Sequence, residues 1–152
     1  MEQEEVYFGG MTSANFKKGH MSGYGVYATS RRIIGVKKRR GVLGGWMVAG
    51  LMGGHAGTVK GDILRSAFAQ AFTKDEGAKQ IKELEKDKDF EVYKENISYI
   101  EIKKPGTLHR GHIKIRPTQG KEIEISMGGH EEFEHMRDLL GAFLPGAVRV
   151  EE

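Results

Sequence analysis

Six histidines are the first residues of this sequence that could do chemistry, because imidazole rings bind metals and carry protons. The segment from His130 to His135 resembles a zinc-protease pattern, but its two histidines are five residues apart. On a helix this spacing rotates one ring about 140° from the other, so both cannot face one ion. Glu131 and His135 share a face, yet two ligands do not make a catalytic zinc site. The sequence predicts no metal site.

Motifs for other catalytic chemistry are also missing from the sequence. It contains no cysteine, no Gly-x-Ser-x-Gly nucleophile elbow and no phosphate-binding loop ending in Gly-Lys-Ser/Thr. We therefore expect a protein that is not an enzyme and has no cofactor.

Cations collect in the first part of the chain. Residues 1–60 contain nine Lys and Arg against three Asp and Glu, whereas residues 61–152 contain fifteen against eighteen. This asymmetry predicts an anionic partner for the first part, such as lipid head groups, nucleic acid or an acidic protein. The alternative is that basic strand edges resist aggregation. The candidate binding residues are Lys17, Lys18, Arg31, Arg32, Lys37, Lys38, Arg39 and Arg40.

A glycine-rich apolar stretch without formal charge, residues 41–59, follows the basic tract directly. It contains Trp46, the single tryptophan, and is too apolar for a solvated linker. Three structures remain open: a membrane span, a packed or membrane-touching helix or hairpin, and a loop folded against the domain. Every fourth residue is small, which lets two backbones approach closely and favours self-association. The candidate residues are Gly41, Gly45, Trp46, Ala49, Gly53 and Gly57.

Short strands and one amphipathic helix are expected to position these residues. Residues 6–8, 24–29 and 33–36 are typical of strands, and residues 90–127 alternate apolar and polar residues in four further strands. In residues 24–29, Tyr24 and Val26 fall on one face and Tyr27 on the other. Residues 131–144 show helical spacing. The pattern predicts an α+β domain with a core of Val26, Ile34, Ile100, Ile113, Ile115, Ile123, Phe133, Met136 and Leu140.

The segment between the two sets of strands is expected to be partly helical. Apolar residues in 63–72 recur at helical spacing. The sequence Thr73-x-x-Glu76 predicts a capping box that opens a polar helix with Ile81 and Leu84 turned inward.

Two segments resemble the strands of a known family. Residues 24–36, Tyr-Gly-Val-Tyr-Ala-Thr-Ser-Arg-Arg-Ile-Ile-Gly-Val, resemble a hairpin of the pleckstrin-homology-like (PH-like) superfamily, in its branch of GRAM and bacterial PH-like domains. Residues 90–102 resemble the next strands, and the later strands and helix 131–144 complete the pattern. The resemblance implies a strongly bent antiparallel sheet of about seven strands, capped by the C-terminal helix. It leaves residues 41–89 as an insertion between the third and fourth strands, glycine-rich over 41–61 and helical over 62–88.

Domains of this family are mostly non-enzymatic and bind lipids or proteins. We therefore expect residues 1–152 to form one PH-like binding module that associates with an anionic membrane surface or lipid. Its acidic first residues do not resemble a secretion signal, which favours a cytoplasmic protein, in solution or peripheral at the inner membrane face. The alternatives are a self-associating protein-interaction scaffold and, less favoured, a binder of single-stranded nucleic acid that stacks bases on Phe16, Tyr24 and Tyr27.

Overall fold

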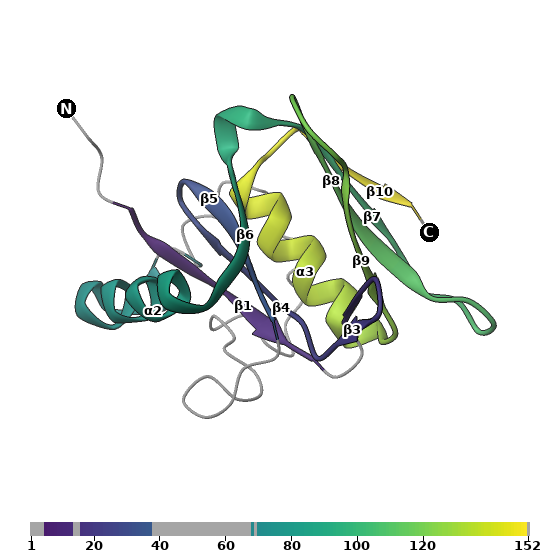
Figure 1. The fold of residues 1–152 in the computed structure, drawn as a ribbon, viewed down its shortest axis with the longest axis horizontal. Coiled ribbons are helices and arrows are strands. Elements are labelled where there is room, and N and C mark those ends of the chain that lie inside the picture. Colours follow the sequence, from purple (N-terminus) through teal and green to yellow (C-terminus); the bar gives the residue numbers. More distant parts are fainter. Residues whose placement is uncertain (1–4, 14–15, 38–67, 69, 152) are drawn as a thin grey trace.

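The computed structural model describes residues 5–13, 16–37, 68 and 70–151 and is an α+β fold with two sheets (Figure 1). The first sheet is antiparallel and has the strand order β1-β4-β5-β6. Its strands are β1 (Tyr7–Thr12), β4 (Gly25–Thr29), β5 (Arg32–Val36) and β6 (Lys88–Tyr93). The second sheet has the order β10-β7-β8-β9-β2-β3. Its strands are β2 (Lys17–Lys18), β3 (Met21–Ser22), β7 (Ile97–Lys103), β8 (Gly111–Pro117), β9 (Ile123–Met127) and β10 (Val148–Glu151).

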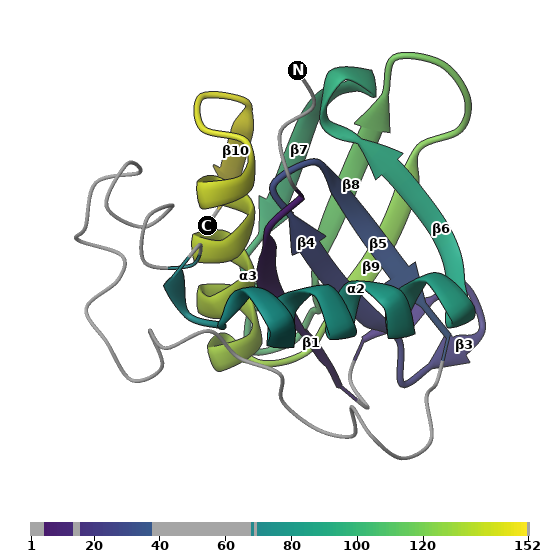
Figure 2. The ribbon, with the colours of Figure 1, turned by 90° about the vertical axis from the view of Figure 1, so that its left-hand side faces the viewer.

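The helix α3 (His130–Phe143) packs along one side of the two sheets, against β1 and β4 of the first and β7 and β10 of the second (Figures 1 and 2). Its apolar side buries Phe133, Met136 and Leu140 at the spacing expected of one helical face. These side chains join the larger hydrophobic cluster, which also takes residues from both sheets. The predicted C-terminal helix and the predicted core are therefore confirmed, except that Ile123 is only partly buried.

A second helix, α2 (Lys74–Asp87), covers the opposite face of the first sheet (Figure 2). Its Leu84 packs in a smaller cluster with Tyr7, Tyr27, Ile34 and Val36. The first sheet is thus buried on both faces: on β4, Tyr27 packs in the smaller cluster with Leu84 of α2, whereas Val26 packs in the larger cluster. The capping box is confirmed, because Thr73 and Glu76 each accept a hydrogen bond from the other's backbone N–H.

The arrangement differs from the expectation of one bent antiparallel sheet of about seven strands. The described residues form ten strands in two sheets that do not close, and β10 pairs with β7 in parallel. Between α3, which ends at Phe143, and β10 the chain turns at Gly146, where φ is +84°. The strand pair β2–β3 was not expected either, since two-residue strands around Gly19 leave almost no periodicity.

A short 3-10 turn, η2 (Lys94–Asn96), carries the chain from β6 in the first sheet to β7 in the second. The glycine-rich segment and Lys38, Arg39 and Arg40 lie outside the described residues. The predictions for Gly41, Gly45, Trp46, Ala49, Gly53 and Gly57 therefore stay predictions.

Candidate functional site

Two of the predicted cations meet at the point where β5 ends. The ammonium groups of Lys18 and Lys37 lie 3.3 Å and 3.6 Å from the carboxylate of Asp89. Lys18 also lies 5.8 Å from the ring centroids of both Tyr24 and Phe90. Strand β2, the end of β5 and strand β6 therefore bring together residues that the sequence places far apart.

The carboxylate between these lysines is held in its ionised form. A hydrogen bond from the Tyr24 hydroxyl, followed by one from Lys18, lowers the pKa of Asp89 despite partial burial. Burial and the adjacent carboxylate raise the pKa of Tyr24. Asp89 thus neutralises part of the local charge and fixes the directions of both lysines.

Lys17 points to the other side of β2, onto the outer face of the second sheet. It is in register with Ser126 of β9, which is in register with His112 of β8, which in turn faces Lys103 of β7. The guanidinium of Arg110 donates to the Ser126 hydroxyl over 3.1 Å. A row of cationic and polar side chains therefore crosses four strands near one end of the sheet.

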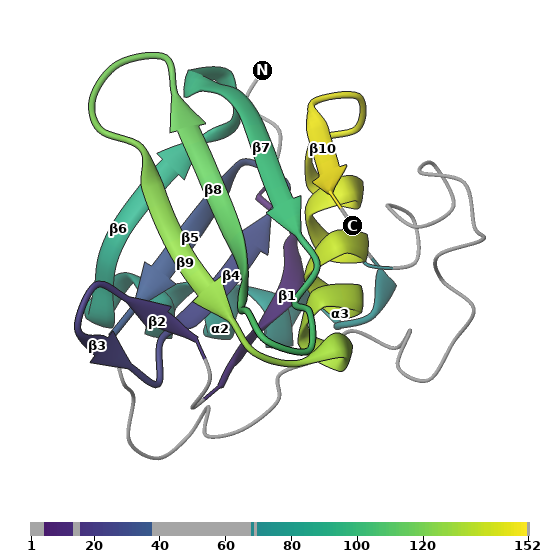
Figure 3. The same ribbon diagram turned by 90° about the vertical axis from the view of Figure 1, so that its right-hand side faces the viewer.

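The loop between β7 and β8 extends from this row and carries an exposed leucine. Leu108 is 95% exposed, at the tip of a turn closed by a hydrogen bond from Gly106 N–H to the His109 carbonyl. Met21 in the β2–β3 hairpin is 36% exposed. Figure 3 shows the hairpin, the end of β9 and this loop at the same, lower end of the molecule. We call it the basic end, defined by Lys17, Lys18, Lys37, Lys103, Lys104 and Arg110.

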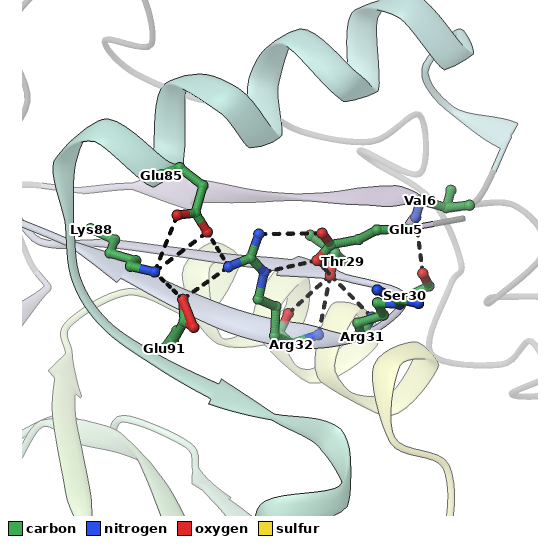
Figure 4. A network of polar contacts seen from close by, with 9 residues as sticks. All are labelled: Glu5, Val6, Thr29, Ser30, Arg31, Arg32, Glu85, Lys88 and Glu91. Carbon is green, nitrogen blue, oxygen red and sulfur yellow. Dashed lines mark hydrogen bonds and ion pairs between the residues drawn. The ribbon is translucent and has the colours of Figure 1, made fainter. Parts of the chain in front are cut away.

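Arg32, another predicted anion-binding residue, is buried and serves the fold instead. Its guanidinium donates to Glu5 over 2.8 Å and to Glu91 over 2.9 Å, and also to Glu85 (Figure 4). Burial opposes the charge, but the hydrogen bonds to Glu5 and Glu85 raise the pKa of Arg32. With its donors committed to carboxylates from three segments, Arg32 is not available to an anionic surface.

Arg31 lies at the turn between β4 and β5, whereas Lys37 follows the far end of β5. A strand of five residues separates the two, which corresponds to about 17 Å. The members of the predicted set that the structure describes therefore do not form one patch. The structure adds Lys103, Lys104 and Arg110, which sequence analysis missed. Lys103 alternates with Ile100 and Ile102 in the sequence, whereas Lys104 and Arg110 lie in the loop between β7 and β8 and have no periodic pattern.

The aromatic residues proposed for base stacking are in the core. Phe16, Tyr24 and Tyr27 are each 0% exposed. Bases stack on rings whose faces are open to solvent. The nucleic-acid alternative was therefore wrong in the residues that it relied on.

Within the described ranges, no group of three or more His, Asp or Glu side chains is arranged to hold a metal ion. His112 instead pairs with Glu101 over 2.6 Å, and this bond lowers the pKa of Glu101. Among the same residues, neither helix combines the length and the apolar composition that crossing a bilayer requires.

Comparisons with protein-family models, with curated proteins and with solved structures found no match to this chain. The proposal of a function therefore depends on the sequence and on the geometry of the described residues.

Proposed function

We propose that this protein is a non-enzymatic, PH-like binding module that associates with an anionic membrane surface through its basic end. The observation that carries the proposal is the exposed Leu108 beside Lys103, Lys104 and Arg110, at the same end as Met21 and Lys17. Stable attachment to a membrane needs two signals, one apolar and one electrostatic, and this end offers both.

The expected energies are sufficient for reversible binding. Each Lys or Arg near an anionic surface contributes about 1 kcal/mol, and burial of a leucine side chain contributes about 1.5–3 kcal/mol. Asp89 subtracts from this charge, while Lys38, Arg39 and Arg40 follow Lys37 directly in the sequence. Trp46, six residues after Arg40, has the side chain that membrane interfaces favour.

The fold supports the same proposal. A four-stranded antiparallel sheet, a second sheet and a C-terminal helix packed against both support the proposal of a PH-like module, to which residues 24–36 and 90–102 point. We accordingly place the protein in the cytoplasm, peripheral at the inner face of a membrane. The rival function is a protein-interaction scaffold that uses the same end.

Sedimentation with lipid vesicles tests the proposal. We expect the protein to bind vesicles that contain phosphatidylserine, to ignore neutral phosphatidylcholine vesicles, and to release as salt rises from about 50 mM to 500 mM. The fluorescence of Trp46 should shift to the blue only with the anionic vesicles. Lys104→Glu should weaken binding about fivefold or more, and Leu108→Ser should also weaken it.

Two matched variants control for charge and hydrophobicity. Lys82→Glu makes the same charge change on the exposed side of α2, and Val6→Ser removes an exposed apolar side chain near Ser30, far from the basic end. Both should bind vesicles as the unchanged protein does. If no vesicle binding occurs at low salt, or if the controls weaken it as much as Leu108→Ser, the scaffold function becomes the better explanation.

A further inference from the structure

The strand β10 forms one edge of the second sheet, and its outer backbone groups are well defined. In its parallel pairing with β7, Ile100 N–H donates to the Ala147 carbonyl and Lys104 N–H donates to the Glu151 carbonyl. In a parallel pair, every second residue of a strand directs both its N–H and its C=O toward the neighbouring strand, and the residues between them direct both groups away from it. Val148 and Val150 therefore direct their N–H and C=O groups away from β7. Within the described residues no strand pairs with this edge.

The side chains of β10 suggest what this edge would accept. Val150 is 44% exposed although its register partner Ile102 is fully buried. Arg149 and Glu151 lie on the opposite face and are exposed. Each sits beside an opposite charge on β7, because Arg149 is in register with Glu101 and Glu151 with Lys103.

We propose that β10 is a homodimerisation edge, which pairs antiparallel with β10 of a second copy about a two-fold axis at Val150. In this register Val150 exchanges both backbone hydrogen bonds with its copy. Arg149 of one protomer then lies directly opposite Glu151 of the other, and the two-fold axis repeats this contact. Both are non-hydrogen-bonded pairs, in which the facing side chains are closer together.

Charge selects this register over its neighbours. A shift that keeps the outward backbone groups paired moves the two-fold axis by one residue. The axis then lies at Arg149, which faces its own copy, or at Glu151, which does the same. Like charges directly opposite each other destabilise a sheet. Only the register centred on Val150 continues the alternation Glu101, Arg149, Glu151, Lys103 across the four central strands.

The interface is small. A four-residue edge buries less than the roughly 1,200 Å² of a standard interface, so the dimer should be weak and visible at high protein concentration. The pairing residues of β10 are not members of the basic end, and the association is tested without lipid, so its failure is distinguishable from a failure of membrane binding. The pairing also uses none of the residues of the small-residue row, 41–57.

Analytical ultracentrifugation over a series of protein concentrations, without lipid, tests the proposal. Arg149→Glu and Glu151→Arg should each raise the dissociation constant about tenfold or more, because each creates two like-charge pairs. An equal mixture of these two variants should recover association, since every cross-strand pair is then opposite in charge. Glu124→Arg on β9 makes a similar charge change on the same face, away from the edge, and should have little effect.

A second variant tests the backbone geometry. Val150→Pro removes an N–H that the protomer does not use, and proline is tolerated where an edge strand's N–H faces solvent. It should abolish association while the circular dichroism and thermal midpoint stay near those of the unchanged protein. The proposal is overturned if the unchanged protein shows no concentration dependence, if Val150→Pro still associates, or if the mixture of charge variants fails to recover association.

Discussion

At the scale of single residues, Arg32 shows how a basic sequence tract can hide a structural cation. Its side chain is 7% exposed and binds carboxylates from the N-terminal segment, from α2 and from β6. Its guanidinium also lies 5.6 Å from the ring centroid of Tyr93. The planar fork of arginine can serve several carboxylates at once, which a lysine ammonium cannot do with the same geometry.

Replacement of Arg32 should therefore destabilise the protein. Arg32→Met should lower the free energy of unfolding by about 1.5–3 kcal/mol, because it removes the charged hydrogen bonds to Glu5, Glu85 and Glu91, which are themselves partly exposed. The free energy of unfolding of Arg32→Lys should lie between those of Arg32→Met and the unchanged protein, because lysine keeps the charge but lacks the planar guanidinium. Urea unfolding at neutral pH measures both. Equal stability of the methionine variant and the unchanged protein would show that the cluster contributes nothing.

The sequence shows that Arg32 is charged but does not show which carboxylates it contacts. Glu5, Glu85 and Glu91 come from three separate parts of the chain, so only the folded topology reveals the cluster. Local patterns performed better, as the capping box at Thr73 and the helical spacing after His130 show. Leu108 gave no signal, because one apolar residue in a loop has no period. Lys103, Lys104 and Arg110 needed the register of β7 and β8 to be recognised.

At the scale of elements, glycine has opposite roles in β1 and α3. A Cβ on Gly10 would lie 2.3 Å from the Val26 carbonyl oxygen and 2.5 Å from the Tyr27 Cα, which are backbone atoms that cannot move aside. A Cβ on Gly141 would meet nothing within 4 Å. The first glycine permits the close pairing of β1 with β4, and the second only weakens a helix.

The same substitution should thus have opposite effects at these two positions. Gly10→Ala should destabilise the protein by about 2 kcal/mol or more, through the collision with β4. Gly141→Ala should stabilise it by about 0.5–1 kcal/mol, because alanine favours the helix. Thermal unfolding of both variants, compared with the unchanged protein, measures the difference. A stabilised Gly10→Ala protein would contradict the strand pairing described here.

At the scale of the whole molecule, His135 lies where α3 meets the edge of the first sheet. Its ring donates a hydrogen bond to the Gly10 carbonyl and lies edge-on to Phe68, 6.2 Å between ring centroids. Its Nε2 atom is buried without a hydrogen-bond partner among the described residues. Burial lowers the pKa of His135 to about 4, and the bond to Gly10 offsets this only in part.

This histidine should make the folded state sensitive to acid. The pKa of His135 is 6.5 in an unfolded chain and about 4 in the folded protein, so between these values the unfolded state binds more protons. Stability is therefore complete above about pH 6.5 and falls as the pH decreases toward 4. The contribution lost between pH 7 and pH 5 is about 2 kcal/mol.

Urea unfolding of the unchanged protein and of His135→Gln, each at pH 7 and at pH 5, measures this contribution. The glutamine keeps a donor for Gly10 but does not titrate, so its loss of stability on acidification should be about 2 kcal/mol smaller. The same loss in both proteins would assign the acid sensitivity to other groups.

The burial of the first sheet on both faces changes what keeps its strands in register. In a sheet with one wet face, a slip of one residue exchanges core side chains for solvent-facing ones and is penalised by hydration. A slip in β4 or β5 would instead exchange one dry interior for another. Steric fit must therefore distinguish the correct register from a shifted one. The rings of Tyr27 and Phe90 lie over Gly10 and Gly35, where any side chain would collide with them. These glycine–aromatic contacts therefore favour the observed register of the strands, because a shifted register would place a side chain where each ring now lies.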